Sequence, residues 1–470
     1  MGGLFGVVAT ENCLHDLFYG TDYHSHLGTV RGGMVVTKTD GFKRNIHDIT
    51  NTPFRTKFEE DLHKLEGNSG IGVISDYEDQ PLLIGSHHGN YAIVTVGRVN
   101  NAQELAHQAM ANHHTHFTEL KGNEVNPTEL VASIINSEPT IVQGIQKMHQ
   151  TIDGSCTLLL LTADAIYAAR DHYGRTPLIL GRKGERTYAV TMESCALPNL
   201  GYTVERELGP GEIVRITPEG IENLAPPRDE MQICSFLWVY YGYPASSYEG
   251  CNAEDVRNRC GAFLARKDTV TPDLVAGIPD SGLGHAIGYA METKIPFKRP
   301  FVKYTPTWSR SFTPQESSMR TLVSKMKLIP IRELIDDKSL LLCDDSIIRG
   351  TQIKDIVQRL FAYGAAEVHM RLASPPLLYS CPYLNFSRSK SKMEFIAYKA
   401  IHALEGDVDD SVLAQYTDAD TDRYAAMVQH IQTQNGLTSL AYQRLEDLIA
   451  AIDLPAEKCC TFCWKGCRRS

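Results

Sequence analysis

Two adjacent carboxylates, Asp344 and Asp345, follow a short apolar run and precede a turn that carries hydroxyl groups. The run at 339–343 is typical of a buried parallel strand, and the turn at 346–351 leads into a segment with an apolar face at helical spacing. Paired carboxylates suit Mg²⁺ or the hydroxyls of a ribose, and the N–H groups that open a helix suit a phosphate. For a bare pair of aspartates, an acidic surface turn is the simpler interpretation.

The segments around this turn predict an open α/β sheet. The helical pattern stops at Gly364, and residues 367–373 follow as another strand. A further strand is expected at 273–278; it ends in the sequence PDSG at 279–282 and precedes another helix. Ligands of such sheets bind at the carboxyl ends of the strands. We therefore expect both turns to contribute to one site.

The string DDSIIRGT at 344–351 resembles the loop that binds phosphoribosyl pyrophosphate (PRPP) in type I phosphoribosyltransferases. The longer stretch LLLCDDSIIRGTQ is similar to one branch of them, the amidophosphoribosyltransferases that open purine synthesis; Gln352 stands where that family usually has threonine. The PRPP-binding residues that the resemblance implies are Ser346, Ile347, Ile348, Arg349, Gly350 and Thr351 in this loop, with Asp280, Ser281 and Lys303 beside it.

The resemblance also implies catalytic roles. Mg²⁺ would be held by Ser281, Asp344 and Asp345, and the two aspartates would face the positive charge that grows at the sugar carbon. Residues 303–333 resemble the loop that closes over PRPP, with Arg310 and Lys327 as its catalytic cations. For any single one of these cations, a solvated surface position is the alternative interpretation.

Composition limits the class of protein. The chain has 470 residues, which is long enough for two domains. Its net charge of −10 and the absence of a Lys/Arg block argue against a nucleic-acid partner. No apolar run approaches the roughly 20 residues of a membrane span, and no signal-peptide pattern opens the sequence. We therefore expect a cytoplasmic protein without a membrane partner.

The first 230 residues read as rich in β-strands and resemble the N-terminal-nucleophile glutaminase domain of the same family, above all at 154–181 and 193–216. The expected fold is thus a glutaminase-like αββα sandwich (1–228) followed by a type I phosphoribosyltransferase domain, a doubly wound α/β fold with a cysteine-bearing tail (229–470). The proline-rich linker at 226–229 would separate them. Residues 387–430 depart from the family and carry no functional interpretation.

The glutaminase chemistry of the family is not expected here. The family begins its mature chain with a nucleophilic cysteine whose own α-amino group acts as the base. In this sequence the matching position is Gly2, which has no side chain. Ser75 replaces the arginine that binds the carboxylate of glutamine, and Val96-Gly97 replaces the Asn-Gly of the oxyanion hole. We predict a domain that no longer hydrolyses glutamine.

Twelve cysteines in such a chain indicate cofactor ligands or buried thiols rather than disulfides. Cys460 and Cys463 form a C-x-x-C pair, which alone could serve zinc, a redox couple or an iron–sulfur centre. The resemblance adds Cys234 and Cys381, the positions of the other two [4Fe–4S] ligands in one subgroup of the family. Structural zinc and unliganded thiols are the alternatives.

The resemblance implies an enzyme that forms phosphoribosylamine from PRPP and ammonia. The ammonia would come from solution or from a partner glutaminase, and the chain would form a homotetramer or a homodimer. One alternative is a regulatory sensor that binds PRPP or a nucleotide without turnover and pairs with an active paralogue. Another is a phosphoribosyltransferase with a different acceptor.

Overall fold

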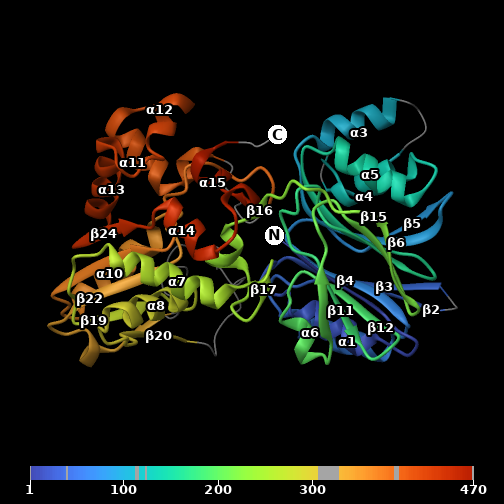
Figure 1. The fold of residues 1–470 in the computed structure, drawn as a ribbon, viewed down its shortest axis with the longest axis horizontal. Coiled ribbons are helices and arrows are strands. Elements are labelled where there is room, and N and C mark those ends of the chain that lie inside the picture. The colour runs from blue at the N-terminus through green and yellow to red at the C-terminus, as the bar shows by residue number, and fades with distance from the viewer. Residues whose placement is uncertain are drawn as a thin grey trace.

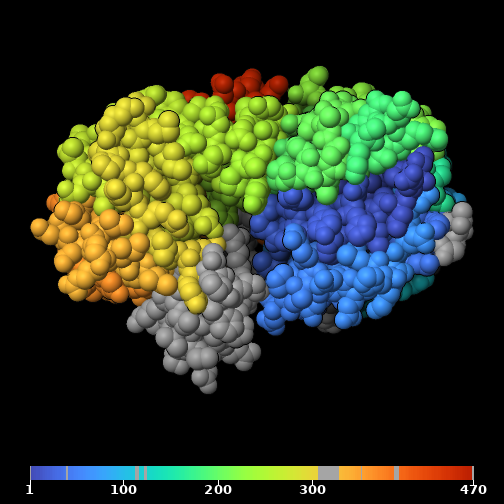
Figure 2. Space-filling view, turned by 90° about the horizontal axis from the view of Figure 1, so that it is seen from below, coloured from blue at the N-terminus to red at the C-terminus, as the bar shows by residue number. Residues whose placement is uncertain are grey.

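The computed structural model describes residues 2–38, 41–111, 116–121, 124–304, 328–385 and 391–467. Figure 1 shows two lobes: an N-terminal one built on large sheets, in blue and green, and a C-terminal one in yellow to red, in which helices surround a smaller sheet. Figure 2, seen from below, shows the blue and green lobe beside the yellow and orange surface of the other.

The N-terminal lobe contains two stacked antiparallel sheets. The first has seven strands in the order β13-β11-β12-β1-β4-β2-β3, and the second has six in the order β15-β14-β10-β9-β6-β5. The strands of the first sheet are β1 (Gly3–Val8), β2 (Arg31–Lys38), β3 (Gly41–Asp48), β4 (Ser69–Ser75), β11 (Ile179–Lys183), β12 (Thr187–Thr191) and β13 (Thr203–Glu207). Those of the second are β5 (Leu82–Ser86), β6 (Gly89–Val99), β9 (Gly154–Leu161), β10 (Ile166–Ala169), β14 (Ile213–Thr217) and β15 (Gly220–Ala225).

Helices cover both outer faces of this pair of sheets. Leu4 of β1 and Leu159 of β9 belong to the apolar core between the sheets, whereas Phe5 faces the helices outside. This alternation of apolar side chains to two different cores explains why the strands are hydrophobic along their whole length. The helices and short strands of the lobe are α1 (Leu14–Asp22), α2 (Phe54–Phe58), η1 (Glu59–His63) and α6 (Ala196–Asn199) on the first sheet, and α3 (Ala102–Ala111), β7 (Leu120–Lys121), β8 (Glu124–Val125), α4 (Pro127–Asn136) and α5 (Ile141–Thr151) on the side of the second.

The C-terminal lobe is built on a parallel sheet in the order β19-β22-β23-β24. Its strands are β19 (Leu274–Gly277), β22 (Ser339–Asp344), β23 (Glu367–Leu372) and β24 (Ser439–Tyr442). The helices are α7 (Ala253–Arg266), α8 (Leu283–Thr293), α10 (Thr351–Ala362), α11 (Ile396–Glu405), α12 (Asp410–Gln415), α13 (Asp422–Asn435) and α14 (Leu445–Ile452). Both lobes therefore have the predicted fold class.

Shorter elements join these parts. They are β16 (Ile233–Cys234), the π-helix η2 (Leu237–Tyr241), β17 (Ser247–Tyr248), β18 (Cys251–Asn252), β20 (Phe301–Lys303), β21 (Leu328–Pro330), η3 (Arg332–Leu334), η4 (Lys392–Glu394), η5 (Ala456–Lys458), β25 (Cys459–Cys460) and α15 (Phe462–Lys465). In the part of the chain that the structure covers, no helix is long and apolar enough to cross a membrane.

Candidate active site

The direction of the chain reverses between β19 and β22. The chain that follows β19 and α8 first runs along the side of β19 that faces away from β22. There Phe297 forms a parallel bridge with Val275 of β19. The chain then returns, and β22 pairs with the inner side of β19 before α10 leads on to β23. Because parallel crossovers are right-handed, α8 and α10 cover opposite faces of the sheet. The carboxyl ends of β19 and β22 thus flank a topological switch point, where such sheets bind ligands.

The predicted acidic turn lies at this point. Asp344 ends β22 and is 8% exposed, and Asp345 follows at 6%. The Ser281 hydroxyl, in the turn after β19, donates a hydrogen bond to Asp344 Oδ1 at 2.7 Å, and the Asp345 N–H donates to the same oxygen at 2.9 Å. The Ser346 hydroxyl donates to Asp345 Oδ2 at 2.5 Å. The structure therefore brings Ser281 and the two aspartates together, as the sequence predicted.

The two carboxylates are electrostatically unfavourable when both are ionised. Burial raises the pKa of Asp344 well above its usual range, and the neighbouring Asp345 charge raises it further. Burial also raises the pKa of Asp345. Neither side chain forms an ion pair with another described residue. A divalent cation shared with a substrate would relieve this repulsion, so the pair fits Mg²⁺. The described residues contain no cluster of three or more His, Cys, Asp or Glu side chains that could hold a metal ion without such a substrate.

The loop after the aspartates leads directly into α10. Gly350 has φ of 80°, a left-handed conformation that favours glycine, and Thr351 begins the helix. Lys303 of β20 forms an ion pair with Asp280 at 2.6 Å, so two further predicted PRPP-binding residues are in contact. Arg310 and Lys327, the predicted catalytic cations, lie outside the described residues.

The segment for which the sequence offered no interpretation contacts this loop. The Ile396 N–H, at the start of α11, donates to the Ile348 carbonyl at 2.7 Å. Glu394 pairs with Arg349 at 2.6 Å, and a Cβ added to Gly350 would lie 2.4 Å from Ile396 Cδ1. Residues 394–396 therefore hold the loop from outside. Sequence reasoning missed them because a contact across about 45 positions leaves no local pattern.

The four positions at which the sequence predicted a loss of glutaminase residues share one pocket in the N-terminal lobe. Gly2, Ser75, Val96 and Gly97 all line it. A Cβ added to Gly2 would lie 2.6 Å from the Ile74 carbonyl oxygen and 3.2 Å from Val96 Cγ2, so the space beside Gly2 is filled. Asn385, from the C-terminal lobe, lines the same pocket and donates to the Gly97 carbonyl at 3.0 Å.

The four predicted cysteine ligands line a second small cavity. Parallel pairing of β16 with β25 places Cys234 opposite Cys460. The Cys463 carbonyl accepts hydrogen bonds from the N–H groups of Leu378 and Tyr379, at 3.1 Å each, and so holds the segment that continues to Cys381. The Cys381 sulfur accepts from the N–H groups of Tyr383 and Leu384 at 3.5 and 3.3 Å. A hydrogen bond from Cys463 is the main cause that lowers the pKa of Cys381 to about 7. Four buried or half-buried thiols around one cavity, with N–H donors to sulfur, fit an iron–sulfur centre.

Comparison with known proteins decides the family. A model of the glutamine amidotransferase domain matches residues 69–199. The chain is 31% identical to an amidophosphoribosyltransferase of Bacillus subtilis over 81% of this chain and 80% of the relative, and 30% identical to one of Methanocaldococcus jannaschii over 82% and 86%. The chain belongs to the amidophosphoribosyltransferase family.

The solved structures of the amidophosphoribosyltransferase family agree with this assignment. A glutamine PRPP amidotransferase from B. subtilis, complexed with ADP and GMP, superimposes with a TM-score of 0.84 at 28% identity, covering 99% of this chain and 96% of that one. A structure titled as the allosteric regulatory enzyme of purine biosynthesis gives 0.84 at 27% identity, over 99% and 95%. The predicted family and fold class are therefore confirmed, and the chain is an amidophosphoribosyltransferase-like enzyme of purine biosynthesis.

Asp344→Asn should stabilise this amidophosphoribosyltransferase homologue in metal-free buffer. The folded-state pKa of Asp344 is raised, so its contribution to stability is present at acid pH and is lost as pH rises through that pKa. The variant should therefore have the higher Tm at pH 8, with the gain shrinking toward pH 4, while its turnover of PRPP falls by roughly 100-fold or more. Thermal melts across this pH range test it, with the exposed Asp229→Asn as the control that should not change Tm. A lower Tm at pH 8 would contradict the expected repulsion.

Gly350→Ala should weaken PRPP binding. The left-handed backbone costs a non-glycine residue about 1–2 kcal/mol, and the new methyl group would clash with Ile396. We expect the KM for PRPP to rise about 10-fold or more, with partial recovery in Gly350→Ala/Ile396→Ala. The matched control is Gly436→Ala, because Gly436 is also left-handed, with φ of 68°, but an added Cβ would meet only Val357 Cγ1, at 4.0 Å. An unchanged KM in the first variant would exclude the loop from PRPP binding.

Proposed function

We propose that this protein forms 5-phosphoribosylamine from PRPP and free ammonia. The observation that carries the proposal is the buried Asp344–Asp345 pair at the switch point of the C-terminal sheet. It combines a place where α/β sheets bind ligands with an excess of negative charge that a Mg²⁺–substrate complex would neutralise. The family relatives are named for this same transfer reaction.

The residues of this site would act mainly by position and charge. Asp344, Asp345 and Ser281 would hold Mg²⁺, which when bound supplies positive charge to the pyrophosphate that leaves C1. The backbone N–H groups at 346–351 would bind the 5′-phosphate. Ammonia forms the new C1–N bond as the C1–O bond breaks, and the extra proton passes to solvent. The carboxylates would stabilise the positive charge at C1 during this exchange.

Further groups would complete the reaction as the family resemblance implies. Lys303 is proposed to face the pyrophosphate beside Asp280, with which it pairs in the structure. The loop containing Arg310 and Lys327 would close over the substrate and exclude water, which otherwise hydrolyses PRPP. A homodimer or homotetramer is proposed as the functional unit.

The ammonia would not come from glutamine hydrolysis within this chain. Gly2 offers no thiolate, and Val96 Cγ2 lies beside the place where a side chain at position 2 would begin. The Ser75 hydroxyl already accepts hydrogen bonds from the N–H groups of Tyr77 and Glu78, at 3.2 and 3.3 Å. Ammonia from solution or from a separate glutaminase is therefore the proposed donor.

We further propose a structural [4Fe–4S] centre bound by Cys234, Cys381, Cys460 and Cys463. The four thiols come from three separate segments, so the centre would fix the C-terminal tail to the rest of the lobe. Tetrahedral zinc is the alternative occupant.

A second candidate function is a PRPP or nucleotide sensor without turnover. Contacts of Glu394 and Ile396 with the phosphate loop favour it, because ligand binding at the loop would act directly on the segment at 391–435. A sensor needs the loop but not the complete machinery for the leaving group.

Pyrophosphate release from PRPP separates these functions. We expect Mg²⁺-dependent release with ammonium chloride at mildly alkaline pH and none above background with glutamine. Gly2→Cys should remain inactive with glutamine, because its Cβ would lie 2.6 Å from the Ile74 carbonyl oxygen. Glutamine-dependent release by the natural chain would contradict the proposed donor. Binding of PRPP without release from either donor would favour the sensor.

A further inference from the structure

Arg175 is a buried cation without a carboxylate partner. Its side chain is 3% exposed, and its guanidinium carbon lies 3.4 Å from the centre of the Tyr383 ring and 5.0 Å from that of Tyr173. The buried Nε has no hydrogen-bond partner, and the guanidinium forms no ion pair with any residue that the structure describes. Stacking on two tyrosines positions the group but leaves its charge uncompensated.

The other buried arginines differ from Arg175. Arg170 donates to three carbonyls and pairs with Glu249, and Arg371 pairs with Asp268. Arg257 donates to the carbonyls of residues 238, 240 and 242. A buried charge is unfavourable unless it is paired and hydrogen-bonded. Arg175 is thus the buried arginine in the described structure that lacks such partners, and this indicates an anion beside it.

The cavity beside Arg175 is the one lined by the four cysteines. Trp464, also 3% exposed, lines the same cavity, and its indole N–H is buried without an acceptor. Two residues with unused buried donors therefore line a cavity that is also lined by four thiols.

We propose that Arg175 and Trp464 tune the redox behaviour of the iron–sulfur centre in this cavity. The guanidinium compensates the net negative charge of a cluster bound by four thiolates, and the indole N–H donates a hydrogen bond to sulfur. Reduction adds a further negative charge, so both groups favour the reduced state and raise the reduction potential. The inference rests on the iron–sulfur centre of the proposed function.

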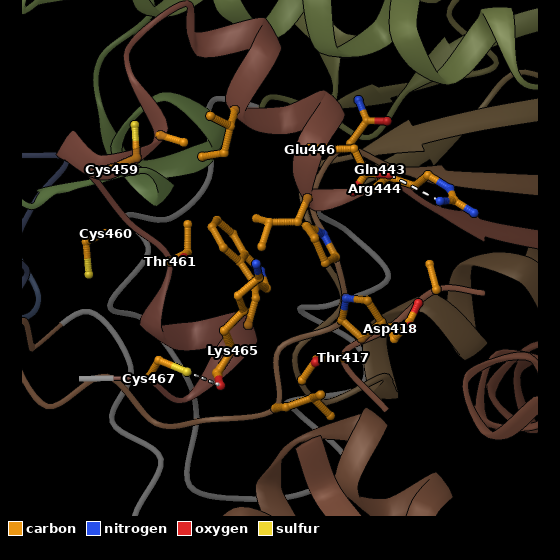
Figure 3. A pocket seen from close by; sticks show the side chains of 18 of the residues that line it. Thr417, Asp418, Gln443, Arg444, Glu446, Cys459, Cys460, Thr461, Lys465 and Cys467 are labelled. Carbon is orange, nitrogen blue, oxygen red and sulfur yellow. Dashed lines mark hydrogen bonds and ion pairs between the residues drawn. The ribbon is translucent and has the colours of Figure 1, made fainter. Parts of the chain in front are cut away.

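The same residues separate the cluster cavity from a larger one. Arg175, Tyr383, Cys460 and Trp464 line both cavities, and the larger one has a volume of about 780 Å³. Figure 3 shows this larger cavity, with Cys460 at its edge and the side chain of Lys465 extending into it. Arg175 and Trp464 thus also form a barrier between the larger cavity and Cys234, Cys381 and Cys463, which line only the smaller one. Removal of either barrier residue should expose the cluster to oxygen.

The test uses the full protein purified without oxygen, with iron and acid-labile sulfide determined first. In Arg175→Met and Trp464→Phe, we expect the midpoint potential, followed by electron paramagnetic resonance, to become more negative than in the natural chain. Arg175→Met should also lose its cluster absorbance several-fold faster in air. The control is Arg182→Met: Arg182 lies 5.8 Å from the Tyr188 ring in the N-terminal lobe, its side chain is 42% exposed, and its loss should change neither quantity.

The outcomes are distinguishable. Cluster-containing variants with the potential and air lifetime of the natural chain would overturn the inference and leave the iron–sulfur centre intact. Zinc in the natural chain, or the absence of iron and sulfide from it, would overturn both the iron–sulfur centre and the inference on Arg175 and Trp464. The transferase function is tested separately, by pyrophosphate release. If Arg175→Met holds no cluster, recovery of iron content in Arg175→Lys supports the role of charge. If Arg175→Lys does not recover the iron content and Trp464→Phe has an unchanged midpoint potential, the proposed tuning by these two residues is contradicted.

Discussion

Repulsion between two buried carboxylates is the constraint on which the C-terminal lobe depends. Asp344 and Asp345 are held at the carboxyl end of β22 by hydrogen bonds from Ser281, Ser346 and the backbone. None of these donors carries a charge, so the surrounding structure fixes the aspartates without neutralising them. Such an arrangement stores unfavourable free energy in the free protein and releases it when a cation-bearing ligand binds. The acidic pair thus lowers the stability of the free folded protein and raises its affinity for a ligand that carries a cation.

The N-terminal lobe also positions groups in the C-terminal lobe. Arg98 and Asn100, at the end of β6, donate to the carbonyls of Cys381 and Pro382 at 2.9 and 2.8 Å. Ser155 of β9 donates to the Tyr383 carbonyl at 2.6 Å. These bonds fix the backbone around one of the four clustered cysteines. Retention of the sandwich is therefore understandable on structural grounds, even where glutamine chemistry is proposed to be lost.

The sequence could predict what short segments encode. The apolar strand before Asp344 and the acidic turn after it are encoded by adjacent residues. The fold class could be predicted from the strand and helix signals of the C-terminal half together with the family resemblance. The sequence could not predict the contact of Ile396 with Ile348 or the isolation of Arg175. Both depend on which distant segments pack together. The predicted roles of Arg310 and Lys327 stay predictions, because these residues lie outside the described structure.

Calorimetry of Mg²⁺–PRPP binding, carried out in two buffers with different enthalpies of ionisation, tests the central claim most directly. Burial raises the pKa of Asp344 and so favours its protonated form in the free protein, whereas bound Mg²⁺ favours the ionised form. We predict that binding releases protons and tightens as pH rises from 6 to 8, and that Asp344→Asn abolishes the part of the release that belongs to the protein. Binding of equal strength and equal proton release in the natural chain and in Asp344→Asn would contradict the assignment of this acidic turn as the Mg²⁺–PRPP site.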